Sequence, residues 1–466
     1  MRLSAATAER LPGGVSRPAY DRDAQTIGIV HFGIGAFHRA HQAVYTDGAM
    51  GAGDRDWAIA GLSLRSPAVR DAMAPQDGLY TVTERGADGE RGRLIGAVRD
   101  LLVAPHDPEA VIRLIAAPAT SIVSFTITEK GYVPDAPAAL ADRGGEGSPS
   151  SIYGFLRHGL ARRRAAGLPG LTLLSCDNLS GNGAKLRGWL GGFLAEADPA
   201  LLAWFEAECA TPSMMVDRIV PATTAEDLAA IEARLGLRDE AAVVTEPFSQ
   251  WVIEDRFAGR RPRWEAVGAT FVEDVSVYEV AKLRMLNGAH SALAYLGLRS
   301  GHEFVHQAIA DPAIRPLVTR LMVEEAGATL PKGFAVADYA QRLLDRFANA
   351  ALAHRLRQIA MDGSQKIPQR WLATLEESRQ AGRRCPAILA ALAAWMLFVR
   401  GACGLVDDPM AERLAGLWAQ AGTAGITRAL FGRDGLFAQY WWADEEDLNS
   451  LERLVQGGQP AAGTTR

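Results

Sequence analysis

The stretch TIGIVHFGIGAFHRA, residues 26–40, joins a short apolar run directly to two glycines. Its first seven residues are typical of a buried parallel strand, because the run is short, largely apolar and ends at a glycine. Gly33 and Gly35 then form a Gly-x-Gly turn, and residues 41–50 favour a helix. A strand, a glycine turn and a helix in this order can bind a pyrophosphate, because glycines let the backbone approach the phosphates and the helix N-terminus supplies free N–H groups. The third glycine of the usual fingerprint is absent, so the cofactor prediction depends on the position of the turn after a strand.

The rest of the first half repeats this alternation of apolar runs and helical stretches. Alternating strands and helices predict an α/β fold, a Rossmann-type doubly wound parallel sheet. The further strands are expected at 57–64, 120–127, 171–175 and 242–245, with helices at 108–116 and 152–166.

The second half changes character near residue 268. Residues 276–298 favour one long, mostly apolar helix, and 302–428 read as helices with short breaks. We therefore expect a NAD(P)-binding Rossmann-like domain at 1–268 and a mostly helical domain with the substrate and catalytic groups at 269–466.

Composition bounds the class of protein. The 466 residues suggest two domains, and 48% hydrophobic with 22% charged residues is typical of globular chains. A net charge of −5 gives no electrostatic reason to expect a nucleic acid partner. No apolar run reaches 18 residues and the N-terminus has no signal-like core, so we expect no membrane span and a cytoplasmic location. Four scattered cysteines without a CxxC pair predict no metal site.

Polar residues gather on one arc of the long helix expected at 276–298. At 3.6 residues per turn, Lys282, Glu279, His290 and Asn287 project at about 0°, 60°, 80° and 140°. Two leucines share this arc, so helical spacing alone fits a structural Lys–Glu pair equally well. Alcohol oxidation needs a base for the hydroxyl proton, which a partly desolvated lysine can provide, and neutral donors for the developing alkoxide, which asparagine amides can provide.

The end of the second strand lacks the acid that usually binds the adenosine ribose. Leu64 is followed by Arg65, and no acid occurs before Asp71. Arg65 could bind the 2′-phosphate of NADP or stack beside the adenine of either cofactor. We expect NAD, with NADP as the alternative.

Seven ordered motifs resemble the mannitol dehydrogenase family, the long-chain polyol-specific dehydrogenases. They cover most of the chain, from residue 33 to residue 366. The motifs are GIGAFHRAHQ (33–42), TITEKGY (126–132), SCDNL (175–179), MVDRIVP (215–221), EPFSQWVIED (246–255), KLRMLNGAH (282–290) and DGSQK (362–366).

The resemblance implies a role for each matching residue. Lys282 would be the general base, Glu279 would pass its proton to water, and His290 would bind a neighbouring hydroxyl. Asn178 and Asn287 would hold the substrate oxygen as it gains charge. The remaining implied positions are Asp217, Lys366 and Arg370 in the substrate pocket, and Gly33, Gly35, Ala36, Phe37, Arg65, Thr128 and Glu129 around the cofactor. The family works without a metal.

Family members act on neutral polyols or on the sugar-acid pair D-mannonate and D-fructuronate. Residues 358–370 resemble the sugar-acid members, and Lys366 or Arg370 would then pair with the substrate carboxylate. A NAD(P)-dependent reaction on D-mannonate/D-fructuronate is therefore favoured. A dehydrogenase of mannitol, arabinitol or sorbitol is the first alternative, and a catalytically silent NAD-binding scaffold is the second. The expected partner is one small sugar molecule, and we expect a monomer or a weak homo-oligomer.

Overall fold

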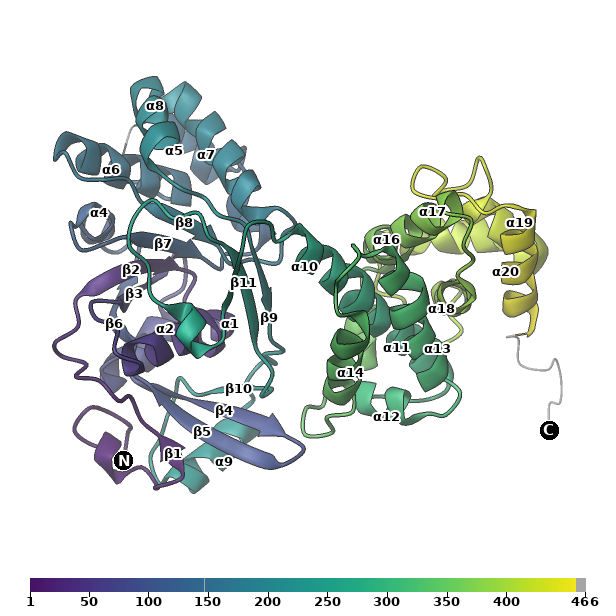
Figure 1. The fold of residues 1–466 in the computed structure, drawn as a ribbon, viewed down its shortest axis with the longest axis horizontal. Coiled ribbons are helices and arrows are strands. Elements are labelled where there is room, and N and C mark those ends of the chain that lie inside the picture. The colour runs from purple at the N-terminus through teal and green to yellow at the C-terminus, as the bar shows by residue number, and fades with distance from the viewer. Residues whose placement is uncertain (146, 458–466) are drawn as a thin grey trace. The chain divides into compact units, whose positions relative to one another are not determined.

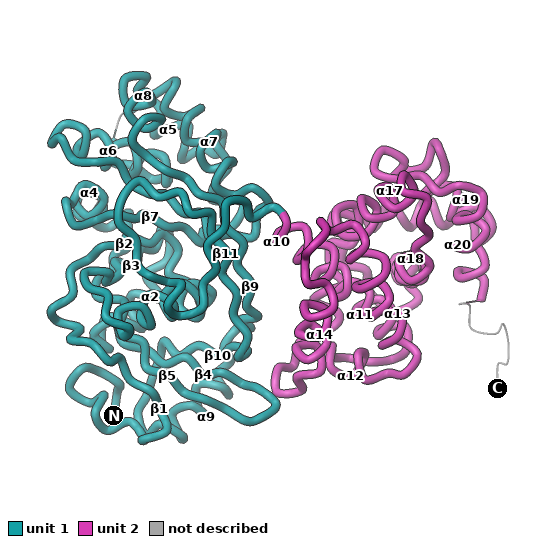
Figure 2. Tube along the Cα trace, in the orientation of Figure 1, with its two compact units in different colours: residues 1–276 teal, residues 277–466 magenta. Residues whose placement is uncertain are grey.

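The computed structural model describes residues 1–145 and 147–457. It divides into two compact units, Met1–Ser276 and Val277–Arg466, which Figure 2 shows in different colours.

The first unit contains a five-stranded sheet in which every neighbouring pair of strands is parallel. Its strand order is β6-β3-β2-β7-β8, so the chain moves outward from β2 in one direction and then returns to add β7 and β8 on the other side. This reversal beside β2 is the topological switch point of a doubly wound sheet. The strands are β2 (Ile27–Phe32), β3 (Ala58–Ser63), β6 (Val98–Val103), β7 (Ile122–Phe125) and β8 (Thr172–Ser175).

Both faces of this sheet are covered, which explains why its strands read as continuous apolar runs. Along β2, Ile29 packs into one hydrophobic cluster, whereas Val30 and Phe32 pack into another on the opposite face. Figure 1 shows the helices that follow β6 and β7 next to strands β7 and β8. The covering helices are α1 (Ala36–Ala40), α2 (Gln42–Gly51), α4 (Pro108–Ala116), α6 (Ile152–Ala165), α7 (Asn182–Ala197) and α8 (Pro199–Glu208). The prediction of a Rossmann-type sheet domain followed by a helical one is confirmed.

The strand expected at 242–245 belongs to a different sheet. There β10 (Val243–Thr245) pairs in parallel with β4 (Tyr80–Gly86), which forms an antiparallel hairpin with β5 (Gly89–Ile95). The short β1 (Val15–Ser16) completes this sheet, and α9 (Ala225–Leu235) packs on it. The placement of 242–245 in the doubly wound sheet was therefore wrong, because an apolar run of this length looks the same in any buried sheet.

A third sheet of three strands has the order β12-β11-β9. β11 (Gln250–Glu254) pairs antiparallel with β9 (Met214–Asp217) and parallel with β12 (Thr270–Val272). Its Trp251 packs on Trp264 with ring centroids 4.4 Å apart, beside the first sheet's core.

The second unit is helical. The long helix expected at 276–298 is present but irregular: α10 (Ser276–Ala281) and α11 (Gly288–Arg299) are joined by a π-helical segment, η5 (Lys282–Asn287). Because a π turn holds one more residue than an α turn, the angles calculated for a regular α-helix do not apply across it. That part of the sequence prediction was wrong.

The core of the second unit is built around α11 and α18 (Pro386–Val399), which pack together. Helix α18 is apolar along nearly its whole length and buried on all sides. Two further π-helical segments, η6 (Leu321–Ala326) and η8 (Pro368–Leu372), both contact η5. The other main helices are α12 (Val305–Ala310), α13 (Arg315–Arg320), α14 (Val336–Phe347), α15 (Leu356–Ala360), α16 (Gly363–Ile367), α17 (Ala373–Gln380), α19 (Ala411–Phe431) and α20 (Glu445–Gly457).

Candidate active site

The loop after β2 requires glycine at its first position. Gly33 has φ 96°, and a Cβ there would lie 2.0 Å from the carbonyl oxygen of Thr126, which directly follows β7. The Thr126 hydroxyl donates to the carbonyl oxygen of Gly33 across 2.6 Å. The loops after β2 and β7 therefore meet at the switch point, where doubly wound sheets bind their ligands.

Two neutral histidines lie directly beneath these loops. His31 of β2 shares hydrogen bonds with Ser124 Oγ (2.8 Å) and Thr126 Oγ1 (2.9 Å), and its ring stacks on His38 with centroids 3.4 Å apart. Burial lowers the pKa of His31 to about 3 and also lowers the pKa of His38. Both rings are thus uncharged near neutral pH, so they support the loop without adding positive charge.

The second glycine of the turn leaves open space. Gly35 is exposed and precedes α1, and a Cβ there would meet only the carbonyl oxygen of Gly33, at 3.8 Å. Ala36 and Phe37 are the first residues of α1 and are half-buried. This arrangement fits a dinucleotide, because backbone can approach a phosphate closely at Gly35. Arg65 is exposed just beyond the end of β3, the strand that neighbours β2.

Residues after β7 and β8 lie at the same edge of the sheet as the glycine loop. Phe32 is in register with Phe125, and Phe125 with Ser175, so the loops after all three strands begin at one level. Thr128, Glu129 and Asn178 are exposed in these loops. The topology therefore brings the predicted cofactor residues and Asn178 to one edge.

Asp217 ends β9 and is buried. Its neighbour Arg218 donates to the carbonyl oxygens of Ala40 and Glu246 and pairs with Glu84 at 2.5 Å. Arg218 is thus a structural cation that joins β9 to the second sheet and to α1.

In the second unit, Lys282 begins the π-helical segment and is buried, which is rare for a lysine. Asn287 ends the same segment. Glu279 lies in α10, about one turn before Lys282, and His290 lies in the first turn of α11. All four predicted residues are therefore on one continuous helix, and the irregular turn separates Lys282 from Asn287 and His290. Single π turns inside helices are frequent at functional sites.

His290 has an acceptor or donor atom available. Burial lowers the pKa of His290 well below its ordinary value, with further contributions from His354, Arg346 and Arg370, so the ring is neutral. It packs against Phe347 at 4.8 Å and edge-on against His354 at 5.2 Å. Within the described part of the chain, His290 Nε2 and His354 Nδ1 are buried without a hydrogen-bond partner. A ligand hydroxyl could satisfy either atom.

The predicted substrate cations have protein partners. Arg370 Nη1 donates to the carbonyl oxygen of Asn287 (3.2 Å) and to Ser291 Oγ (2.8 Å), and burial lowers the pKa of Arg370 to about 10. Lys366 Nζ donates to the carbonyl oxygen of Met361 across 2.5 Å, and burial lowers the pKa of Lys366. A carboxylate-binding role for Lys366 and Arg370 stays a prediction.

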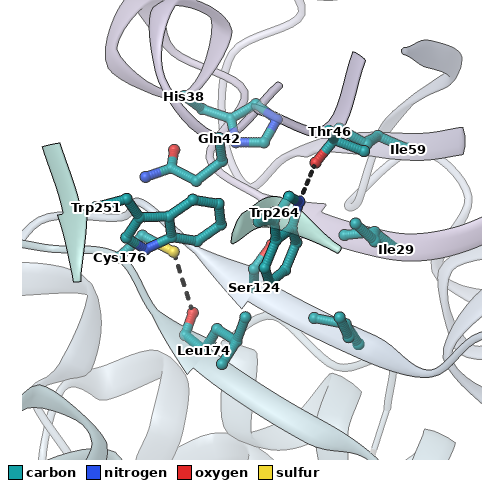
Figure 3. A pocket seen from close by; sticks show the side chains of 11 residues that line it. Ile29, His38, Gln42, Thr46, Ile59, Ser124, Leu174, Cys176, Trp251 and Trp264 are labelled. Carbon is teal, nitrogen blue, oxygen red and sulfur yellow. Dashed lines mark hydrogen bonds between the residues drawn. The ribbon is translucent and has the colours of Figure 1, made fainter. Parts of the chain in front are cut away.

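A small cavity lies behind the candidate cofactor site (Figure 3). It is lined by His38, Gln42, Ser124 and Cys176 together with apolar side chains, and its volume is about 10 Å³. That is room for one water molecule. Trp264 also lines the cavity, and its indole nitrogen donates to Thr46 Oγ1 across 3.1 Å. The cavity therefore cannot hold a sugar or a nucleotide.

The described residues hold neither a metal-binding cluster nor a helix that could span a membrane. Residues 1–145 and 147–457 contain no group of three or more His, Cys, Asp or Glu side chains placed to hold a metal ion. Among these same residues, every helix is too short or too polar to cross a membrane.

Sequence reasoning missed the groups that support the predicted residues. Asp177, Tyr132 and His31 lie between or beneath the loops at the carboxyl edge of the sheet, and His354 faces His290. Asp177 was visible in the SCDNL motif, directly before Asn178. Tyr132 and His31 also stand in quoted stretches, but the local sequence does not reveal their contacts. These contacts, like that of His354 with His290, join residues that are far apart in the sequence.

Comparisons with known proteins agree with this architecture. The family model "Mannitol dehydrogenase Rossmann domain" matches residues 27–266, and "Mannitol dehydrogenase C-terminal domain" matches residues 274–439. The D-mannonate oxidoreductase of Escherichia coli is 41% identical over 444 residues, covering 91% of each chain. A mannitol 2-dehydrogenase of Pyrenophora tritici-repentis is also 41% identical, over 90% of this chain and 78% of that one.

A solved structure has the same fold. The mannitol 2-dehydrogenase of Pseudomonas fluorescens, in a ternary complex with NAD and D-mannitol, is 37% identical, with a TM-score of 0.83 over 98% of this chain and 96% of that one. The predicted family and the predicted class, a dehydrogenase acting on CH–OH groups, are confirmed. The chain belongs to the mannitol dehydrogenase family.

Proposed function

We propose that this chain is a NAD-dependent oxidoreductase that interconverts D-mannonate and D-fructuronate, a fructuronate reductase. The observation that carries the proposal is the similarity to the Escherichia coli D-mannonate oxidoreductase, which extends over 91% of both chains. The resemblance of residues 358–370 to sugar-acid members of the family also favours this substrate.

Lys282 is the proposed base. When bound, the nicotinamide supplies the chemistry of accepting a hydride from the substrate carbon or returning it. Lys282 takes the hydroxyl proton during oxidation and gives it back during reduction, and Glu279 passes this proton to water. Burial of Lys282 supports the assignment, because a desolvated lysine more readily serves as a neutral base.

Neutral donors are proposed to hold the substrate oxygens. The amides of Asn178 and Asn287 donate to the oxygen that becomes partly negative, and His290 Nε2 binds a neighbouring hydroxyl. The neutral state of the buried His290 ring suits this role, since a neutral ring can accept from or donate to a hydroxyl as its tautomer requires. Asp217 is proposed to bind a further hydroxyl.

The substrate carboxylate is proposed to bind near Lys366 and Arg370. These cations lie one turn apart on the continuous helix formed by α16 and η8. Burial lowers the pKa of each side chain, because a positive charge there lacks the solvation of bulk water. An anionic substrate group would offset that loss.

The proposed cofactor residues are those at the carboxyl edge of the parallel sheet. Gly33, Gly35, Ala36 and Phe37 form the turn that would face the pyrophosphate, and Thr128 and Glu129 would lie on the nicotinamide side. Arg65 stands where the adenosine ribose binds in such sheets, so binding of NADPH beside NADH is part of the test.

A neutral polyol is the second candidate substrate. The similarity to two mannitol 2-dehydrogenases, one of them a complex with D-mannitol, favours it. In that case the same base and donors act, and Lys366 binds a hydroxyl. A silent NAD-binding scaffold is less well supported, because such a protein has no need of Lys282, Asn178, Asn287 and His290 together.

The test is a comparison of substrates with the purified full chain, followed by nicotinamide absorbance. D-fructuronate and D-fructose are offered with NADH or NADPH, and D-mannonate, D-mannitol and D-arabinitol with the oxidised cofactors. A kcat/KM that is highest for D-fructuronate supports the proposal. A higher value for fructose or a polyol rejects the sugar-acid substrate and indicates a polyol dehydrogenase. If no substrate is turned over, the catalytically silent NAD-binding scaffold is the remaining candidate.

A further inference from the structure

The backbone at Thr128 has a conformation that side chains other than glycine avoid. Its φ and ψ are 62° and 165°, a region that is populated almost only by glycine. The other described non-glycine residues with positive φ are all aspartates, which tolerate such angles better. Thr128 is β-branched, so its angles must be imposed by its surroundings.

The carboxylate of Asp177 imposes them. Thr128 N donates to Asp177 Oδ1 across 3.1 Å, and Ile127 N donates to Oδ2 across 2.9 Å. The hydroxyl of Tyr132 also donates to Oδ2, at 2.7 Å. Both carboxylate oxygens are thus used to hold one tight loop, residues 126–132, on the carboxyl edge of the sheet.

The backbone of Asp177 is fixed from the other side. Its carbonyl oxygen accepts from Leu179 N (2.8 Å) and from Asn182 Nδ2 (3.2 Å). The same Asn182 amide exchanges two hydrogen bonds with the backbone of Met214 at the start of β9. Asp177 therefore joins the loops after β7 and β8 to the third sheet.

We infer that Asp177 is a positioning residue that keeps the strained loop at Thr128 and the exposed Asn178 at a fixed spacing. This inference rests on the proposed function, in which Thr128 and Glu129 lie beside the nicotinamide and Asn178 holds the reacting oxygen. If both groups are held rigidly before the ligands bind, the entropy cost of ordering flexible loops is not incurred at each turnover.

The experiment uses Asp177→Asn, Thr128→Gly and the double variant of the full chain. Asparagine keeps the shape of the side chain but replaces one acceptor oxygen with an amide that cannot accept, so one backbone N–H loses its partner. Glycine adopts the angles of Thr128 without strain, so the loop needs the carboxylate less. NADH binding by fluorescence titration, kcat, KM and Tm are measured for each.

We expect Asp177→Asn to weaken NADH binding and to lower kcat/KM by about 10²-fold. Thr128→Gly alone is measured as the reference for the double variant, which should regain most of the NADH affinity that Asp177→Asn loses. If Asp177→Asn binds NADH like the parent, or if Thr128→Gly restores nothing, the inference is overturned.

Two controls separate positioning from loss of the fold. Asp142 is a buried carboxylate outside the candidate site that, like Asp177, accepts from two backbone N–H groups, those of Ser150 and Ser151. Asp142→Asn should therefore lower Tm and leave NADH affinity unchanged. If Asp177→Asn fails to fold, Tyr132→Phe is the second variant. It removes the hydroxyl that donates to Asp177 and accepts from Ser175 Oγ, and it should weaken NADH binding less than Asp177→Asn, with the same rescue by glycine.

Because NADH titration needs no substrate, the outcome is independent of the proposed reaction. A parent chain that binds NADH but reduces neither fructuronate nor fructose would end the proposed function, and the affinities of the variants would still decide the role of Asp177.

Discussion

Arg370 donates from Nη1 to the carbonyl oxygen of Asn287 across 3.2 Å, which joins two π-helical segments, η8 and η5. The next residue, Trp371, donates from its indole nitrogen to the carbonyl oxygen of Gly288. In a π turn the backbone hydrogen bonds shift by one residue, so side chains from a neighbouring helix can bond to the carbonyls of the turn. Arg370 thus fixes the backbone of the proposed oxygen-binding Asn287, whatever the substrate.

Substitution of Arg370 distinguishes this positioning role from a role in binding a carboxylate. We expect Arg370→Ala to lower kcat/KM by about 10²-fold for D-fructose, because a displaced Asn287 affects both reactions, and to lower it further for D-fructuronate, which also loses a partner of its carboxylate. A loss confined to D-fructuronate would leave only the carboxylate role, and an equal loss for both substrates would leave only the positioning role. Arg428→Ala, which removes only an exposed pair with Glu445, is the control and should change neither value.

Removal of the proposed base should affect turnover and spare cofactor binding. We expect Lys282→Ala to lower kcat by about 10²- to 10⁴-fold, because the substitution removes the proposed proton acceptor. NADH affinity should stay near that of the parent. Lys332→Ala, at an exposed turn of the same unit, serves as the control. Turnover that survives Lys282→Ala would exclude this lysine as the base.

Substituting the two glycines of the cofactor loop should affect different properties of the protein. Gly33→Ala places a Cβ 2.0 Å from a backbone oxygen at a positive φ, so we expect a large fall in Tm. Gly35→Ala meets nothing closer than 3.8 Å, so the fold should survive while NADH binds more weakly. The measurements are thermal unfolding and NADH titration. Equal Tm and weaker NADH binding for both variants would contradict this division of roles.

Acid should destabilise the first unit through its buried histidines. Burial lowers the pKa of His31 to about 3, below its ordinary value near 6.5. The unfolded chain therefore binds a proton below about pH 6.5 that the folded chain excludes, so the free energy of unfolding falls as pH decreases. Between pH 7 and pH 5 this amounts to about 2 kcal/mol for His31.

Urea unfolding at the two pH values tests this expectation. His31→Gln keeps a polar side chain that does not titrate, so the variant should lose about 2 kcal/mol less than the parent between pH 7 and pH 5. A variant as sensitive to acid as the parent would show that His31 does not exclude the proton.

The sequence predicted those parts of the fold that depend on local pattern. The strand ending at Phe32 and the turn at Gly33 were visible because burial on both faces and a positive φ leave a direct trace in residue type. The strand at 243–245 was assigned to the wrong sheet, since its few apolar residues carry no information about the strand beside them. Its pairing partner, β4, lies more than 150 residues earlier in the chain, so the pairing depends on the tertiary fold.

The candidate site was predicted as a set of residues but not as an arrangement. Motifs named Lys282, Asn287 and His290, and the structure places them on one helix. The π turn between them was not predicted, because it depends on how η5 packs against η6 and η8. The bond from Asp177 to Thr128 was missed for a similar reason: it joins positions 49 residues apart that only the parallel sheet brings together.

The π-helical segment makes this stretch sensitive to length as well as to composition. Deleting one residue, such as Leu283, would return η5 to an ordinary α-helical turn and leave α11 in its present register, because a π turn holds one more residue than an α turn. Deleting a second residue would instead rotate α11 by about 100° relative to Lys282. His290 and the core face of α11 would then point elsewhere, although the remaining side chains were kept. The π turn therefore lets this stretch lose one residue, but not two, without separating the proposed base from its partners.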